Sequence, residues 1–344
     1  MKKEVRTFFN ILITGIGIGV IMGTSLKLYL TTTIKNNNSI DLTNKENLIS
    51  RSNLINKYNN YNKEIKELSE KWNLLIREES SLEGGAFLLL IDNFKYAGAN
   101  EDNAYPASST IKIPLLVLAM KKIDNGELSL NSPVKLEKDL VQGDDKWKIN
   151  RPANNIYSIH QLLIEMIRGK NDTATNLIVE KLGGRKSINE KLKLIGLKNT
   201  EINNLLPDVN LKNKTSAKDL VLAISLVESG DFISSRSRDL FREILFKSSS
   251  NKLLPLGLLE GLSDKTESID SQLLFNGFRV YNHSGEIGGL AGDAGTIEMP
   301  DSKRAVAAFL VKGSINNSSP QRLIRNMSAA IVEIIKPIRI LDFD

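Results

Sequence analysis

Hydrophobic residues follow two patterns along the chain, and the first is a set of short apolar runs. These runs are AFLLLID at 86–92, FRVYNHSG at 278–285, GTIEM at 295–299 and AVAAFLVKG at 305–313. A run of this length is too short for a free-standing helix, so we expect four buried strands. One lies near the start of the folded part and three lie in the last third of the chain.

The second pattern is apolar residues at helical spacing. It occurs at 65–76, in SIHQLLIEMIRG (158–169), in SAKDLVLAISLVESG (216–230) and at about 320–336. Ser158 and Gln161 form a capping-box pattern, and Gly230 is a typical helix end. Strands from both ends of the chain with helices between them predict an α+β fold, in which one sheet is assembled from the two ends and a helical lobe is inserted. A cleft between the lobes is the natural place for a site.

The first thirty residues have the pattern of a membrane-targeting segment. Lys2, Lys3 and Arg6 precede an uncharged stretch at 7–26, which is about the length that crosses a bilayer as a helix. A cleaved signal peptide is the alternative, but no alanine precedes Ala86, so an A-x-A cleavage site is absent. We expect residues 1–30 to be a single-pass anchor in the cell membrane, with the rest of the chain on the extracytoplasmic side.

The stretch at 31–61 is rich in Asn, Lys, Thr and Ser and has too few apolar residues to form a core. We interpret it as a polar linker. The folded domain is then expected at 62–340.

Composition narrows the possible functions. The chain is 41% hydrophobic and 25% charged, as is typical of globular proteins, and its net charge of +6 is spread out. No Lys/Arg block is interleaved with aromatic residues, so nucleic acid is not an expected partner. With no cysteine and only His160 and His283, neither a thiolate zinc site nor a multi-histidine site can form, and we expect no metal or other cofactor.

The segment STIK at 109–112 is the first candidate for catalysis. The S-x-x-K pattern also occurs at 132–135 and 249–252, but only Ser109 follows a predicted strand and turn and opens a long apolar helix. There Lys112 shares a helix face with Ser109, and a desolvated lysine can accept the hydroxyl proton. The helix N-terminus also offers free amides to an oxyanion. The alternative is a helix cap followed by a snorkelling lysine.

Four segments together give the chain a family resemblance. PASSTIK (106–112), GKNDTATNLI (169–178), LLPDVN (205–210) with NKTSAKDL (213–220), and NHSGEIGG (282–289) resemble, in order and spacing, the motifs of the class A β-lactamase family and its serine peptidase relatives. The resemblance covers about residues 62–340. It implies an antiparallel sheet with helices on its faces, an inserted all-helical lobe, and acylation of Ser109 by a β-lactam or a D-Ala-D-Ala-like cell-wall peptide, assisted by Lys112.

The second motif departs from the family pattern. Where the family has Ser-Asp-Asn, the sequence TATN sets a register that leaves Lys170, Asn171 and Asp172 in those places. The serine that passes a proton to the leaving nitrogen in the family is therefore missing. The ammonium of Lys170 is a possible proton donor, and a solvated lysine on a loop is the alternative.

The third motif conforms to the family. His283, Ser284 and Gly285 stand where the family has Lys or His, Thr or Ser, and then Gly. By this resemblance the backbone N–H of Glu286 would be the second oxyanion donor, beside that of Ser109. A structural histidine with satisfied hydrogen bonds is the alternative for His283.

The loop motif lacks the residue that the family uses for deacylation. The family has a glutamate in E-P-x-x-N, and the matching positions here run from Leu206 to Asn210. Leucine cannot activate water, although Asp208 and Glu201 are nearby carboxylates. We therefore expect an acyl-enzyme that hydrolyses slowly. The alternative is a weakened relative that binds cell-wall peptide or a partner protein without turnover.

Overall fold

The protein is described by a computed structural model at residues 63–136, 156–246, 251–262, 276–314 and 319–335, and at the single positions 269, 273 and 274. All of these belong to the unit Ile55–Asp344. The predicted anchor and linker lie outside the described residues. Within the described ranges, no helix combines the length and the apolar character needed to cross a bilayer.

A six-stranded sheet forms the centre of this unit, in the order β1-β3-β2-β10-β9-β8. Its strands are β1 (Lys63–Glu64), β2 (Glu83–Leu90), β3 (Lys95–Ala99), β8 (Arg279–Ile287), β9 (Leu290–Glu298) and β10 (Arg304–Lys312). The four predicted strands are confirmed as β2, β8, β9 and β10. Neighbouring strands are antiparallel, except that the two-residue β1 runs parallel to β3.

The two ends of the chain meet in the middle of the sheet. Strand β2 pairs with β10 along its whole length, for example Leu88 with Ala307. The prediction of one sheet built from both ends is therefore confirmed. Strand β3 was not predicted, because its sequence KYAGA has no apolar run and owes its place to pairing with β2.

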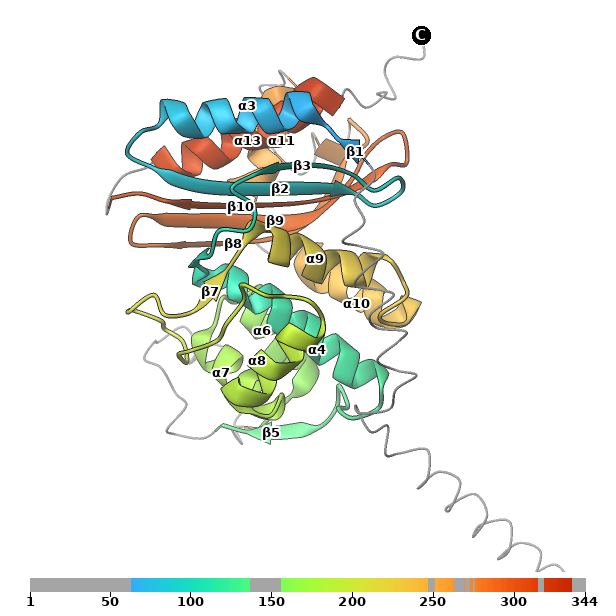
Figure 1. The fold of residues 1–344 in the computed structure, drawn as a ribbon. Coiled ribbons are helices and arrows are strands. Elements are labelled where there is room, and N and C mark those ends of the chain that lie inside the picture. The colour runs from blue at the N-terminus through green and yellow to red at the C-terminus, as the bar shows by residue number, and fades with distance from the viewer. Residues whose placement is uncertain are drawn as a thin grey trace, which may run out of the picture. The chain divides into compact units, whose positions relative to one another are not determined.

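Three helices cover one face of the sheet: α3 (Lys66–Glu78), α11 (Leu254–Gly261) and α13 (Ser319–Ile335) (Figure 1). Trp72 of α3 is fully buried and packs edge-to-face on Phe309 of β10, with ring centroids 5.6 Å apart. Its Nε1 donates a hydrogen bond of 2.8 Å to the carbonyl of Met327 in α13. One side chain thus ties two helices from opposite ends of the chain to the sheet.

The other face carries α9 (Ala217–Glu228), which contacts β2, β9, β10 and α4 (Figure 1). Around α4 (Lys112–Asp124) lie α6 (Ile159–Ile167), α7 (Asp172–Lys181), α8 (Gly184–Leu194) and α10 (Ser235–Phe246). The predicted inserted lobe is confirmed, but it is not entirely helical. A short ladder of β5 (Pro133–Lys135) with β6 (Ile156–Ser158) lies within it, and β4 (Tyr105–Pro106) pairs with β7 (Lys214–Thr215) beside it.

Polar side chains fix where the lobe helices begin. The predicted capping box is present: Ser158 Oγ accepts from Gln161 N at 3.2 Å, and Gln161 Oε1 accepts from Ser158 N at 2.8 Å. Asn171 caps α7 by accepting from Ala174 N at 2.8 Å. Because the cap sets the first turn of α7, it also sets the position of Asp172.

A buried charge network joins the lobe to the sheet. The fully buried carboxylate of Glu228 in α9 accepts hydrogen bonds from Arg242 of α10 and, at 3.0 Å, from Thr296 of β9. Arg242 also pairs with Glu298 at 3.1 Å. A buried carboxylate is tolerated only when it is paired in this way, so the network fixes α9 and α10 against the sheet.

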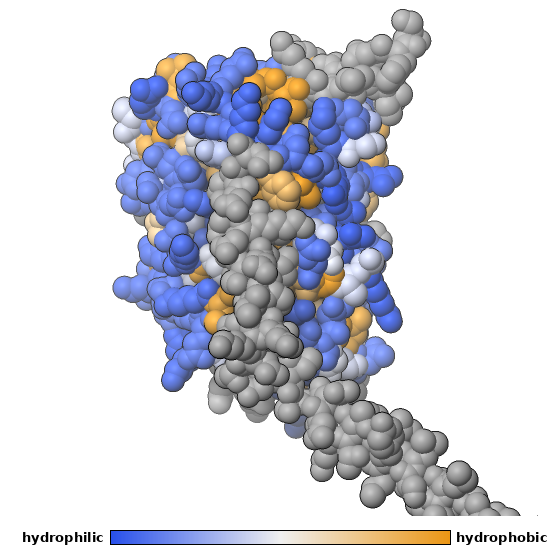
Figure 2. Space-filling view, turned by 45° about the vertical axis from the view of Figure 1, so that its right-hand side comes forward, coloured by the Kyte–Doolittle hydropathy of each residue, from blue (hydrophilic) through white to orange (hydrophobic). Residues whose placement is uncertain are grey.

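Figure 2 shows that one face of the molecule is mostly hydrophilic where it is described, with hydrophobic residues in small, separate patches. Small patches of this kind are normal on a protein surface and do not indicate a large docking surface on that face.

Candidate active site

The candidate nucleophile Ser109 lies in η1 (Ser108–Ile111), a single 3-10 turn that leads into α4. Its side chain is partly exposed, and η1 contacts strands β8 and β9. Ser108 has a φ of 48°, a conformation that a residue with a side chain rarely adopts and that often occurs at functional sites.

The α-helix begins at Lys112, not at Ser109 as the sequence suggested. Pro114 therefore falls in the first turn of α4, where backbone N–H groups have no helical partner, so its missing N–H costs little.

Lys112 is fully buried and does not snorkel to solvent. Its Nζ donates to the carbonyl of Lys170 at 3.1 Å and to Asp172 Oδ1 at 3.2 Å. Burial lowers the pKa of Lys112; Asp172 opposes this shift and the charge of Lys170 adds to it. A lysine that loses its proton more readily than usual is suited to accept the hydroxyl proton of the serine one turn earlier.

The second motif is at the junction that leads into α7. Lys170 has a φ of 50°, Asn171 is the helix cap, and Asp172 begins the helix. The structure thus brings the backbone of Lys170 and the side chain of Asp172 to Lys112, about sixty residues earlier. The side chain of Lys170 is exposed, and within the described residues its ammonium has no hydrogen-bond or ion-pair partner.

The third motif lies on β8, which runs past η1. A Cβ placed on Gly285 would lie 2.5 Å from Ser109 N, so this strand approaches the nucleophile more closely than any side chain would allow. Because alternate residues of a strand share a face, His283 points to the same side as Gly285.

His283 is fully buried, and neither ring nitrogen has a hydrogen-bond partner within the described part of the chain. Burial places its pKa well below the usual value; the charges of Lys112 and Lys170 add to this, and the backbone of Ser109 offsets part of it. The imidazole is consequently neutral at pH 7.

A buried carboxylate that no sequence pattern indicated lies behind the third motif. Asp293 of β9 is directly opposite Ser284, so both face the side of the sheet away from His283. It accepts hydrogen bonds from Asn282 Nδ2 at 2.9 and 3.0 Å and from Leu254 N at 3.0 Å. Burial raises its pKa to about 7, against these hydrogen bonds.

The loop that contains Leu206 is fixed to α7 by a residue whose role was not predicted. The buried side chain of Asn176 accepts from Leu206 N at 2.8 Å and donates to Leu206 O at 2.7 Å. Asn176 belongs to the TATN stretch that set the register of the second motif. A fully buried asparagine needs partners for its amide, and the backbone of Leu206 supplies them.

The two carboxylates near the loop are already engaged. Asp208 accepts from Asn204 Nδ2 at 2.8 Å and from the backbone N–H groups of Lys212 and Asn213 at 3.0 and 2.6 Å. Glu201 is 44% exposed and pairs with Lys193 at 3.6 Å. Asp208 therefore holds the loop together and Glu201 takes part in a surface ion pair, so neither is a good substitute for the family's glutamate.

Two predicted site residues have side chains outside this cluster. Asn210 is exposed, and Glu286 accepts from Gln321 Nε2 at 2.8 Å. The proposed part of Glu286 in the oxyanion hole needs only its backbone N–H, which follows Gly285 directly.

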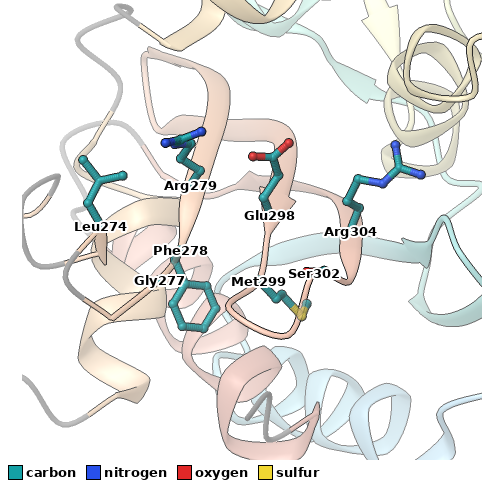
Figure 3. A pocket seen from close by; sticks show the side chains of 8 residues that line it. All are labelled: Leu274, Gly277, Phe278, Arg279, Glu298, Met299, Ser302 and Arg304. Atoms are coloured by element: carbon teal, nitrogen blue, oxygen red, sulfur yellow. The ribbon is translucent and has the colours of Figure 1, made fainter. Parts of the chain in front are cut away.

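A separate pocket of about 360 Å³ lies at the other end of β8 (Figure 3). Arg279, Glu298 and Arg304 line it, and a second pocket of about 410 Å³ shares Arg279 with it. Six residues separate Arg279 from Gly285, or about 20 Å along a strand. This pocket is therefore distinct from the candidate active site.

Comparison with known proteins agrees with this arrangement. The sequence profile of the Beta-lactamase enzyme family matches residues 64–335, so the chain belongs to that family and the resemblance is confirmed. Beta-lactamase CARB-3 of Pseudomonas aeruginosa is 24% identical over 161 residues, which are 45% of this chain and 55% of that protein. Extended-spectrum beta-lactamase PER-1 of the same organism is 23% identical over 244 residues, covering 65% and 73%. The chain thus spans about half the length of CARB-3.

Solved structures extend the comparison. PBP-A is 31% identical with a TM-score of 0.71, and the match covers 79% of this chain and 97% of PBP-A. A leucine-to-glutamate mutant of PBP-A, solved as an acyl-enzyme complex with penicillin G, matches equally well. An ancestral class A β-lactamase is 20% identical with a TM-score of 0.66, covering 77% and 99%, which shows that the fold is shared.

Proposed function

We propose that this protein is a serine hydrolase that forms an acyl-enzyme through Ser109 with β-lactams or D-Ala-D-Ala-like cell-wall peptides. The observation that carries the proposal is the fully buried Lys112, whose pKa is lowered and which follows Ser109 by one turn. Burying a lysine costs free energy, and a helix cap alone does not explain why Lys112 is buried. A nucleophile that needs a base beside it does explain the burial.

The acylation step follows from these groups. Ser109 Oγ forms a bond to the substrate carbonyl carbon while its proton passes to Lys112 Nζ. The carbonyl oxygen becomes an oxyanion. In this proposal the backbone N–H groups of Ser109 and Glu286 stabilise it. The carbon–nitrogen bond then breaks, and Lys112 returns the proton to the leaving nitrogen. Donation of this proton by Lys170 is the alternative.

Two further observations support the proposal. The PBP-A mutant forms an acyl-enzyme with penicillin G, and PBP-A is 31% identical to this chain over the matched region. The close approach of Gly285 to Ser109 N brings together the two segments that would supply the oxyanion donors.

Deacylation is proposed to be slow. It needs a base beside a water molecule, and Leu206 stands in the position of the family's glutamate. Asp208 and Glu201 are engaged elsewhere. The acyl-enzyme should therefore form faster than it decays.

The test is labelling with a fluorescent penicillin. We expect one label per chain, located on Ser109 by mass mapping, and its loss in Ser109→Ala. Ser132→Ala is the matched control, because Ser132 opens a second S-x-x-K segment and should leave labelling unchanged. A label on another serine, or equal labelling of Ser109→Ala, would identify a different nucleophile. A folded chain that is never labelled would favour the weakened relative that only binds.

We also propose that residues 1–30 anchor the domain to the outside of the cell membrane, on the evidence of Lys2, Lys3 and Arg6 before an uncharged stretch. Protease added to intact spheroplasts should remove a domain that otherwise stays with the membrane fraction. A cytoplasmic protein used as the control should survive the same treatment. Recovery of this chain as a protected, soluble protein would contradict the proposal.

A further inference from the structure

The candidate site contains one positive charge that nothing in the described residues neutralises. Lys112 is paired with Asp172 at 3.2 Å, and His283 is neutral because it is buried. The ammonium of Lys170 is exposed and has no partner among these residues. The free cation of the site therefore comes from the second motif and not from the third.

One backbone contact and three electrostatic effects place Lys170 next to the reacting groups. Its carbonyl lies 3.1 Å from Lys112 Nζ, and its charge affects the pKa values of Lys112, His283 and Asp293. The ammonium thus acts on groups from both the nucleophile helix and the third-motif strand.

The position of Lys112 also indicates which part of a substrate meets Lys170. In the proposed reaction Lys112 returns its proton to the leaving nitrogen, so that nitrogen must approach Lys112 Nζ. The acyl carbonyl points the other way, toward the backbone of Ser109 and Glu286. Lys170 therefore lies on the leaving-group side of the bond that breaks.

We propose that Lys170 determines specificity by binding a carboxylate on the leaving group. Such a substrate ends one residue after the scissile bond, as a peptide cut at its C-terminal residue does, or carries an equivalent carboxylate beside a β-lactam nitrogen. This inference rests on the proposed function and assigns the recognition of negative charge to a residue that replaces the family's serine. It also gives Lys170 a role other than proton donation.

Lysine and arginine separate the two roles. Arginine keeps the positive charge and binds carboxylates well, but it does not release a proton at ordinary pH. If Lys170 binds the carboxylate, Lys170→Arg keeps the preference for a carboxylate substrate and Lys170→Met loses it. If Lys170 instead donates the proton, both variants lose the acylation rate that depends on that proton.

The experiment compares a penicillin with a free carboxylate and its methyl ester by their second-order acylation rate constants. We expect the wild type and Lys170→Arg to prefer the carboxylate, and Lys170→Met to lose about 10- to 100-fold of that preference. Lys181→Met is the control, because Lys181 is the last residue of α7, about 14 Å along the helix axis from Asp172, and pairs with Glu180. Added salt should reduce the preference of the wild type, because salt screens the attraction between the ammonium and the carboxylate.

A binding measurement keeps this inference separate from the proposed function. In Ser109→Ala, the Kd of a D-Ala-D-Ala peptide is compared with that of its C-terminal amide, with and without Lys170→Met. A carboxylate preference that depends on Lys170 supports the inference even if Ser109 is never acylated. Three results would overturn the inference. The first is that Lys170→Met slows acylation equally by the penicillin and its methyl ester, and the second is that it leaves the carboxylate preference unchanged. The third result is that Lys170→Arg does not retain the carboxylate preference.

Discussion

Replacing Lys112 by alanine is expected to slow acylation of Ser109 by about 10²- to 10⁴-fold, the usual effect of losing a positioned base. The reason is that Lys112 is fully buried and has a lowered pKa, so its neutral form is available to take the hydroxyl proton. The measurement is the second-order rate constant for labelling by a fluorescent penicillin. Lys135→Ala is the control, because Lys135 is the exposed lysine of the S-x-x-K segment at 132–135.

The pH dependence of this step has a definite sign. Only the neutral amine of Lys112 accepts a proton, so the rate should rise with pH as Lys112 loses its charge. Because burial lowers its pKa, this rise should occur below the 10.5 of an ordinary lysine, and Asp172 limits how far below. Removing the carboxylate in Asp172→Asn should move the rise to still lower pH. An acylation rate that is unchanged in Lys112→Ala would show that another group is the base.

Replacing Leu206 by glutamate is expected to shorten the lifetime of the acyl-enzyme, by about 10²-fold or more if the new carboxylate acts as a positioned base. The backbone of Leu206 is held by two hydrogen bonds from Asn176, so a new side chain should start from a fixed position. The measurement is the decay of the acylated mass with time in the wild type and in Leu206→Glu.

Leu205→Glu is the matched control, because Leu205 is the neighbouring residue, is already 37% exposed and lacks the Asn176 clamp. It should leave the decay unchanged. Rapid multiple turnover by the wild type would mean that this chain already has a base for deacylation, and the account of the loop would then be wrong.

Local sequence patterns predicted those elements whose signal lies within one short stretch of the chain. The runs that became β2 and β10 and the capping box at Ser158 were recognised because each pattern lies within ten residues. Strand β3 was missed because its place depends on pairing with β2. Register between distant strands is not visible in a short window.

The residues of the candidate site were also predicted only where a short motif contains them. The motifs indicated that Ser109, Lys112 and Asp172 belong together, and the structure places Asp172 beside Lys112. The sequence did not reveal the clamp of Asn176 on Leu206 or the burial of Asp293, because both depend on segments at least thirty residues away. It also did not show that the exposed side chain of Lys170 would lack a partner.

Gly285 makes the third motif sensitive to a single substitution. A side chain at this position would meet the backbone of Ser109 and push the two oxyanion donors apart, while the strand pairing with Gly292 could persist. A single substitution there is therefore expected to leave a folded protein that no longer acylates Ser109. The chain departs from the family pattern in its second motif and in its loop, but the glycine at 285 leaves the approach of β8 to Ser109 unobstructed.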